Sequence, residues 1–359
     1  MEAKIRALIE RASEGDLRRL SNDTTIGLPL LEQALAGALA GWTTGMVERL
    51  ARVAGVDPAA VWAQGPLPAA PSLAFLRGSW PDFHQGDMRL LTRALEAGCT
   101  LRAMSDLLAA DIGARYRPSR VSCSPPFYED GYRLARQLRA HLGAPTSALP
   151  NLYDLAGGLL DVFVASAPLH TARLEAVTVY SSEGAAIVLN HRVERRGVMR
   201  RRTLAHELCH ALYDEQDSPA DAVLEQDSAG EQDASPREQR ARAFAAELLV
   251  PLAGLNEHLG IPAMTTHTST AREYVATVSS IFGAPPELVA NHLANHRYVH
   301  LDLREALVAH VAGTDIAVAD EASDWLSARV LEAADAEHIT GQRGSELITL
   351  FSVGNDLAA

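Results

Sequence analysis

Apolar residues recur every three or four positions through the first 120 residues, a region rich in Ala, Leu and Arg. This spacing predicts amphipathic helices. Breaks at Gly41, Gly65-Pro66, Pro81 and Gly113 separate one helix from the next. We therefore expect residues 1–120 to form an all-helical domain.

Within this region, Met46–Gly65 predicts two short helices joined by a tight turn. Asp57 suits the N-cap of the second helix, and Pro58 suits its first position. The pair resembles part of a helix-turn-helix domain of the phage-repressor type. However, Pro58–Gln64 holds no Arg, Lys or Asn that could contact base edges. We expect a degenerate or purely structural domain, with DNA binding as the alternative. The first helix gathers four apolar residues on one face: Val47, Leu50, Ala51 and Ala54.

The pattern changes after a Ser- and Pro-rich break at Arg117–Phe127. Tyr128–Ala144 predicts an amphipathic helix that ends near a Gly, and Asn151–Leu159 predicts a shorter helix. Three short runs with strand character follow, and a Ser-Ser-Glu-Gly hairpin signal joins the last two. The three runs are Leu159–Ala165, Ala176–Tyr180 and Ala185–Asn190. Helices, then a small sheet, then further helices predict an α+β domain.

The composition supports globular domains and argues against a membrane protein. The chain has 359 residues, of which 47% are hydrophobic and 21% charged, enough to bury the cores of two or three domains. No apolar run approaches the ~20 residues that cross a bilayer. The first residues mix both charge signs, unlike a secretory signal. We expect a cytoplasmic protein whose three cysteines stay reduced.

The net charge of −13 is concentrated in the last part of the chain. Residues 1–120 hold 14 basic and 13 acidic side chains, whereas residues 201–359 hold 10 and 25. An acidic, breaker-rich stretch, Asp214–Asp233, predicts a loop. Because a negative field repels phosphate backbones, nucleic acid is an unfavourable partner for the C-terminal part and is conceivable only for the N-terminal domain.

A candidate metal-binding motif lies in the predicted helix Arg201–Glu215, where His206, Glu207 and His210 form a His-Glu-x-x-His pattern. On a helix that advances ~100° per residue, the two histidines lie ~40° apart, so both can direct a nitrogen at one Zn²⁺ ion. Glu207 lies beside them and can take a proton from water as a general base. Four apolar residues on the opposite side are expected to pack on the sheet: Leu204, Leu208, Ala211 and Leu212.

A catalytic zinc site needs a third protein ligand and one open position. A further predicted helix, Ser235–Pro251, could supply that ligand. Spacing alone leaves Glu231 and Glu238 as rivals, and it places Glu247 on the opposite side of the helix from Glu238. Glu238 also fits a capping box with the N-cap Ser, in which the Glu carboxylate reaches back to the N-cap N–H. The residues by themselves leave these alternatives open.

The sequence around these residues resembles the ImmA/IrrE family of metallopeptidases over roughly residues 128–299. The shared features are a strand that ends in Asn190, an Arg-rich lead-in to Thr-Leu-Ala-His-Glu-x-x-His, and the later segment EQRARAFAAELLVP. In that family the Glu that opens the later segment is the third zinc ligand, and it corresponds to Glu238. The helical N-terminal part is similar to repressor-like domains that are fused to family members.

The resemblance implies a zincin-like metallopeptidase core at residues 121–260, which follows the helical domain and precedes a helical C-terminal region at residues 261–359. It implies a cytoplasmic, zinc-dependent endopeptidase with Glu207 as general base. The implied substrate is a regulatory protein, such as a helix-turn-helix repressor of a mobile element or stress response. The implied Zn²⁺ ligands are His206, His210 and Glu238.

Other residues near the motif carry weaker signals. Cys209 stands where the family often has Gly, and we expect a buried packing thiol. Tyr213 lies near the same helix face as the histidines and could stabilise an oxyanion. His292, His296 and His300 recur one helical turn apart with no acidic or Cys partner nearby in sequence, so solvated or capping roles are expected.

Two rival classes of function stay open at this point. One is a DNA-binding transcriptional regulator in which the metal site is a sensor or a relic. The other is an antitoxin-like protein that binds its partner without cutting it. The near-neutral N-terminal region, which lacks a basic recognition face, favours the enzyme.

Overall fold

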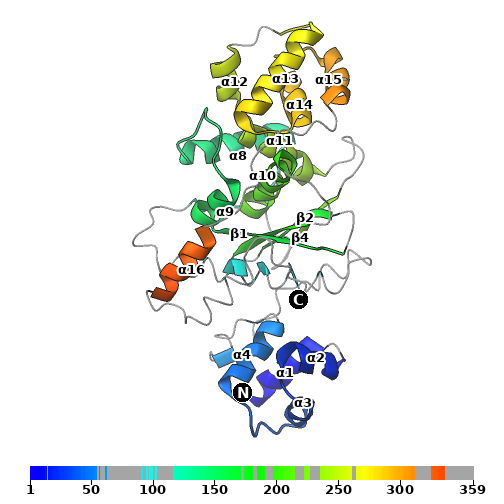
Figure 1. Ribbon diagram of the computed structural model, residues 1–359, viewed down its shortest axis with the longest axis vertical. Coiled ribbons are helices and arrows are strands. Elements are labelled where there is room, and N and C mark those ends of the chain that lie inside the picture. Colours follow the sequence, from blue (N-terminus) through cyan, green and yellow to red (C-terminus); the bar gives the residue numbers. More distant parts are fainter. Residues whose placement is uncertain are drawn as a thin grey trace.

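The computed structural model contains an N-terminal helical cluster, a core with a mixed sheet, and C-terminal helices (Figure 1). The residues that it describes are 1–13, 15–54, 56, 61–62, 87, 90–91, 94–95, 97–99, 102, 116–170, 174–180, 184–190, 197–214, 222–226, 235–260, 264–311 and 325–335. Within these ranges, no helix has both the length and the apolar character needed to cross a membrane. The predicted α+β class is confirmed.

Four helices near the N-terminus enclose a hydrophobic core of their own. They are α1 (Glu2–Ser13), α2 (Leu17–Thr24), α3 (Leu28–Leu35) and α4 (Thr44–Val53). The apolar face predicted for α4 is confirmed, because its four residues named above are all buried. Most of the predicted second helix, Pro58–Gln64, lies outside the described residues, so its DNA-binding role stays untested.

The sheet has four strands in the order β1-β3-β2-β4. The central strand β3 runs parallel to β1 and antiparallel to β2, and β2 also pairs antiparallel with β4. All six residues of β3 are buried, which explains the apolar run Ala185–Leu189 before its final Asn190. The bounds of the strands are Val162–Ala167 for β1, Leu174–Tyr180 for β2, Ala185–Asn190 for β3 and Ala222–Gln226 for β4.

Several details of the sheet differ from the predictions, and β2 begins two residues before the predicted Ala176. The first strand begins at Val162 rather than Leu159, because helix α9 (Leu152–Leu160) continues to Leu160 and Asp161 ends it in the left-handed conformation, with φ 54°. The stretch Asp214–Asp233, predicted as a loop, contains the strand β4, in which Val223 pairs with Thr178 and Leu224 with Val177 of β2.

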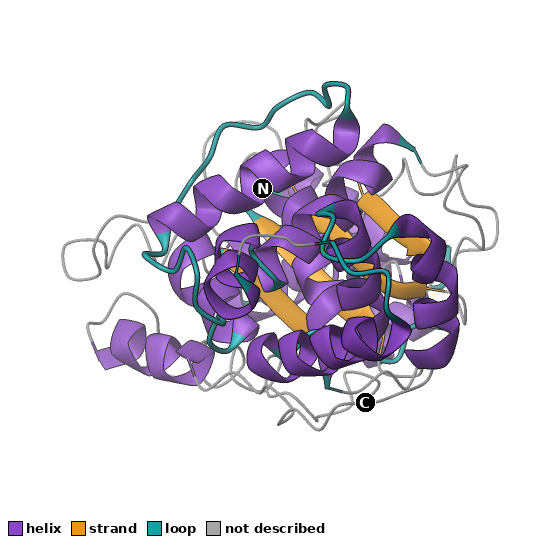
Figure 2. Cartoon of the chain, turned by 90° about the horizontal axis from the view of Figure 1, so that it is seen from above, coloured by secondary structure: helices purple, strands orange, loops and turns teal. Residues whose placement is uncertain are grey.

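Helices pack around the sheet (Figure 2). Helix α10 (Val198–Tyr213) packs on β2 and β3, and α11 (Pro236–Leu249) packs against both α10 and α8 (Phe127–His141). Leu204 and Leu208 of α10 share one hydrophobic core with Ile187 of the sheet, as predicted. The helix is also buried on its polar side, because α11 lies there.

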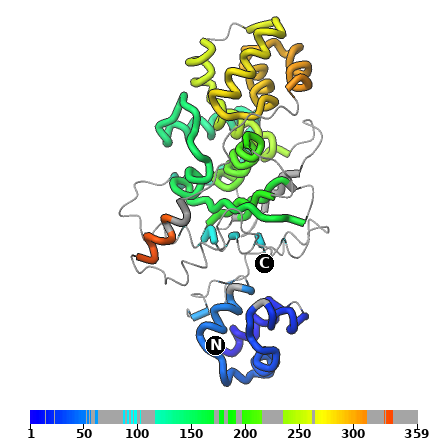
Figure 3. The backbone as a smooth tube through the Cα atoms, in the orientation of Figure 1, coloured from blue at the N-terminus to red at the C-terminus, as the bar shows by residue number. Residues whose placement is uncertain are grey.

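The C-terminal helices continue this core. They are α12 (Leu252–Leu259), α13 (Thr268–Phe282), α14 (Pro286–Asn295), the 3₁₀ helix η1 (Leu301–Leu303), α15 (Arg304–Val311) and α16 (Trp325–Asp335). Val278 and Leu293 belong to the same hydrophobic cluster as the residues of α8 to α11, so one core extends past residue 260. Helix α16 returns along the molecule to pack beside α9 (Figure 3).

Gly131 sets how closely α8 and α11 approach each other. A Cβ atom at this position would lie 2.2 Å from the Arg240 carbonyl oxygen and 2.8 Å from the Phe244 nitrogen. Both atoms are backbone atoms of α11, so a larger residue must push the two helices apart.

We therefore predict that Gly131→Ala lowers the free energy of unfolding by ~1–3 kcal/mol, measured by chemical denaturation. Gly45→Ala is the matched control, because a Cβ there meets only the end of the Arg49 side chain at 3.9 Å. The control should leave stability unchanged or raise it by up to ~1 kcal/mol. Equal stability of the two variants would contradict this packing constraint.

Candidate metal centre

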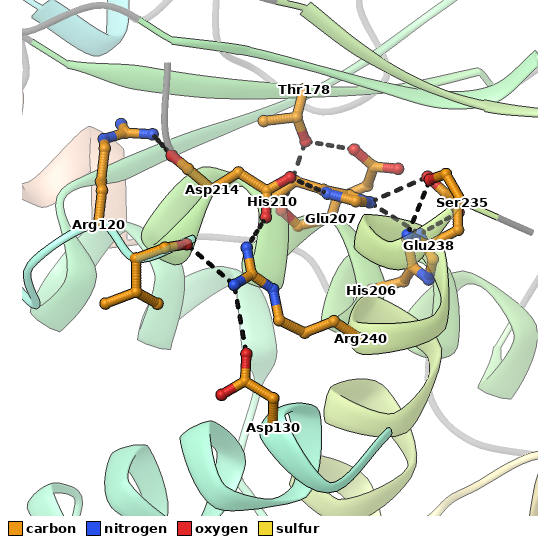
Figure 4. Close-up of polar contacts among 11 residues, drawn as sticks. Arg120, Asp130, Thr178, His206, Glu207, His210, Asp214, Ser235, Glu238 and Arg240 are labelled. Carbon is orange, nitrogen blue, oxygen red and sulfur yellow. Dashed lines mark hydrogen bonds and ion pairs between the residues drawn. The ribbon is translucent and has the colours of Figure 1, made fainter. Parts of the chain in front are cut away.

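The two histidines of the motif lie one turn apart on α10 and point to the same place. Both side chains are buried, and His206 Nε2 lies 3.0 Å from His210 Nε2. Glu207, between them in sequence, is also fully buried. The helix therefore presents its two imidazoles side by side, as the spacing predicts (Figure 4).

Glu238 reaches the imidazoles from the first turn of α11. Its carboxylate oxygens lie 3.2 Å from His206 Nε2 and 3.4 Å from His210 Nε2. Ser235 caps the helix, since its Oγ accepts a hydrogen bond from the Glu238 N–H (3.3 Å). The predicted capping box is thus only half formed, and its Glu carboxylate faces the histidines. The rival Glu231 lies outside the described residues.

The donor set fits a divalent metal ion. In a tetrahedral site with bonds of ~2.1 Å, ligand atoms are separated by ~3.4 Å. Here the two imidazole nitrogens are 3.0 Å apart, and each has one of the two Glu238 oxygens at 3.2 or 3.4 Å. Two imidazoles and one carboxylate form the ligand set of many catalytic zinc sites. The Glu238 side chain is 19% exposed, so the group opens towards solvent on that side.

The electrostatics of the group also favour a bound cation. Burial disfavours the charged form of Glu238, but its contacts with His206 and His210 outweigh burial and lower its pKa. Burial alone would lower the pKa of His210, yet contacts with Asp214 and Glu238 raise it to about 10. In the ion-free protein a proton on His210 therefore balances these carboxylates, a role that a metal ion can fill.

Glu207 is held on the side of α10 that faces the sheet. Its Oε2 accepts a short hydrogen bond from the Thr178 hydroxyl in the middle of β2. One turn earlier, the Thr203 hydroxyl donates to Glu175 Oε2 of the same strand (3.1 Å). The face of α10 towards β2 is therefore partly polar, in addition to the apolar packing that was predicted. These contacts give Glu207 a fixed position next to the imidazole pair.

Comparison with known proteins agrees with this geometry. Residues 160–293 match the model of a peptidase family described as the IrrE N-terminal-like domain. This segment belongs to the ImmA/IrrE family. The match spans β1 to α14 and so includes both helices that carry the candidate ligands. No curated protein matches the chain in a sequence search.

In the IrrE-like domain, a buried ion network orients His210. Asp214 Oδ2 lies 2.7 Å from His210 Nδ1, and Asp214 Oδ1 accepts a short hydrogen bond from the Arg240 guanidinium. Arg240 also donates to the Val121 carbonyl (3.0 Å) and lies 3.4 Å from Asp130 Oδ2 of α8 (Figure 4). Carboxylate contacts of this kind fix the tautomer and orientation of a ligand histidine.

Sequence reasoning missed these supporting residues. Asp214 was assigned only to the acidic loop, although its spacing of four from His210 on a helix places the two side chains together. Thr178 could have been noticed as a polar residue inside an apolar strand. Arg240 carries no local signal, because its partners Asp130 and Asp214 lie far from it in sequence.

Two weaker predictions near the motif have opposite outcomes. Cys209 is fully buried in the hydrophobic core, as predicted, and burial raises the pKa of its thiol. Tyr213 is buried as well, but its hydroxyl lies 2.8 Å from the Tyr116 hydroxyl and 3.5 Å from the Leu134 carbonyl oxygen. These contacts direct it towards α8, so the predicted oxyanion role is not supported.

The prediction for the three C-terminal histidines was correct only for His300, which caps η1 by accepting a hydrogen bond from the Asp302 N–H (3.3 Å). His292 is fully buried and His296 is 13% exposed, and both lie against Glu247 of α11. Their acidic partner is thus distant in sequence. Burial disfavours the Glu247 carboxylate, but contacts with the two histidines lower its pKa to about 2.

We predict that Asp214→Asn weakens Zn²⁺ binding to the full chain ~10–100-fold, because it removes the charge that orients His210 Nδ1. A competition titration with a chromophoric chelator measures this. Asp302→Asn is the matched control, because its side chain is 86% exposed and pairs with a histidine outside the site. Unchanged affinity in Asp214→Asn would show that His210 does not depend on this contact.

Proposed function

We propose that the protein is a zinc-dependent endopeptidase, with His206, His210 and Glu238 as metal ligands and Glu207 as general base. The observation that carries this proposal is the convergence of three ligand side chains from α10 and α11, at contact distances of 3.0 to 3.4 Å. Glu207 is buried on α10 beside the two histidines. Membership of the domain in a metallopeptidase family supports the same conclusion.

A bound Zn²⁺ ion would supply Lewis-acid polarisation of the scissile carbonyl and lower the pKa of water to ~7. The rest of the chemistry belongs to side chains of this chain. Glu207 accepts the proton of the attacking water and returns it to the leaving amine. Its hydrogen bond with Thr178 helps to fix the orientation of the carboxylate. Asp214 accepts a hydrogen bond from His210 Nδ1–H, which leaves Nε2 unprotonated and directed at the ligand group.

The substrate that we infer is a regulatory protein, such as a helix-turn-helix transcriptional repressor. The resemblance to ImmA/IrrE peptidases over roughly residues 128–299 supports this class. Charge adds a second argument, because residues 201–359 hold 10 basic and 25 acidic side chains. A negative surface attracts a basic partner, and a DNA-binding protein is basic where it contacts phosphates.

We predict that Glu207→Gln lowers the cleavage rate by ~10²–10⁴-fold, because the amide cannot accept the proton. The variant should retain the zinc content of the parent protein, since Glu207 is not a ligand. Metal analysis and a cleavage assay measure the two properties separately. Glu273→Gln, on the exposed side of α13, is the control and should change neither. Full activity in Glu207→Gln, or loss of its zinc, would refute the assigned role.

The substrate is tested by incubating the purified full chain with the repressor encoded beside it, with and without a chelator. We expect one defined cleavage that the chelator abolishes and that slows as ionic strength rises, because salt screens the charge attraction. Binding without cleavage would favour the antitoxin-like alternative. Cleavage that is indifferent to salt would remove the electrostatic argument for a basic substrate.

A further inference from the structure

A second group of two histidines and a glutamate lies at the other end of α11. Glu247 is in the last turn of that helix, and His292 and His296 are one turn apart on α14. Glu247 Oε2 lies 3.5 Å from His292 Nε2 and 3.6 Å from His296 Nε2. The side chains of Glu247 and His292 are fully buried. The residue types and the i, i+4 histidine spacing repeat those of the first group.

The distances in this second group exceed those of hydrogen bonds. A charge-assisted bond between imidazole and carboxylate measures ~2.7–2.9 Å, whereas the ligands of a tetrahedral ion are ~3.4 Å apart. Among the described residues, neither Glu247 Oε2 nor His296 Nε2 makes a hydrogen bond, although both atoms are buried. Two buried polar atoms without hydrogen bonds, at about the separation of two ligands of a tetrahedral ion, can both bind one metal ion.

Neighbouring groups hold the glutamate in the orientation that an ion requires. Glu247 Oε1 accepts a hydrogen bond from the Leu252 N–H (3.2 Å) and lies 3.5 Å from Arg136 Nε. These contacts occupy one oxygen and leave Oε2 directed at the histidines. The Tyr132 ring packs against both imidazoles, at centroid distances of 5.5 Å and 5.1 Å. Fixed outer contacts of this kind are typical of metal ligands.

One contact competes with an ion. His292 Nε2 lies 2.9 Å from the Val250 carbonyl oxygen, so in the ion-free protein this nitrogen donates a hydrogen bond there. Metal binding at Nε2 would move that proton to Nδ1, which is buried and makes no hydrogen bond among the described residues, and would break the bond to Val250. The His296 side chain is 13% exposed and provides the route by which an ion can enter.

We propose that Glu247, His292 and His296 form a second site for a divalent transition metal of the Zn²⁺ class, with a structural role. It is separate from the first site, because nine residues of α11 place Glu247 ~13.5 Å along the helix from Glu238 and on the opposite face. An ion here joins α14 to α11 and fastens the C-terminal helices to the core. The proposal does not depend on peptidase activity.

Titration of the metal-free full chain with Zn²⁺ tests this proposal. The parent protein should bind two equivalents tightly. The double variant His206→Asn/His210→Asn, which removes the first site, should bind one, and its thermal midpoint should rise when Zn²⁺ is added. His296→Asn in the parent chain should also bind one equivalent. His267→Asn is the control for adventitious binding to an exposed histidine and should keep two.

The outcomes separate the two sites. If the first-site double variant stays folded by circular dichroism but binds no Zn²⁺ and gains no thermal stability from it, the second site is refuted and the cluster is a buried proton-sharing network. Two equivalents in a folded His296→Asn would refute it equally. If that variant does not fold, the first-site variant alone decides. Failure of the first site, and with it of the peptidase proposal, would instead appear as one equivalent in the parent chain that the first-site variant keeps and His296→Asn loses.

Discussion

The buried guanidinium of Arg240 is the interaction on which the site depends. It lies on α11 and meets Asp130 of α8 and Asp214 at the end of α10, so one side chain ties three helices together. A buried charge is tolerated only when its partners are in place, and removal of one partner typically costs ~3–5 kcal/mol. The network therefore fixes the one arrangement of helices in which Glu238, two residues before Arg240, faces the histidines.

Much of the fold follows from the sequence because its signals are local. The hydrophobic period of α8, α10 and α11 is set by residues within each helix, and the central strand β3 was predicted with its exact bounds. The start of β1 was wrong because the apolar run Leu159–Ala165 suits a buried helix end as well as a strand. β4 was missed because its short run is embedded in acidic residues.

Some residues of the site are placed by the helix that carries them, and others by contacts with distant parts of the chain. His206, Glu207 and His210 share one helix, so their relation is fixed by helical geometry. The place of Glu238 depends on how α11 crosses α10, and only the family resemblance selected it from its rivals. Asp130 and Arg240 are 110 residues apart, and Glu247 and His292 are 45 apart. No periodicity links residues so distant, and their meeting is a consequence of packing.

Both clusters pose the same electrostatic problem at opposite ends of one helix. The pKa of Glu238 and that of Glu247 are lowered although burial opposes ionisation, so each carboxylate stays charged because of the imidazoles beside it. A buried anion is stabilised best by a cation, whereas each neutral imidazole supplies one N–H donor and one lone pair. A proton or a metal ion can supply positive charge at either group, and at the second Arg136 Nε, 3.5 Å from Glu247 Oε1, contributes to it. At the first group, Glu207 lies beside the proposed metal ligands and can act as general base for hydrolysis. At the second, Tyr132 packs against the imidazoles and Arg136 lies beside the carboxylate, which suits an ion that holds helices together.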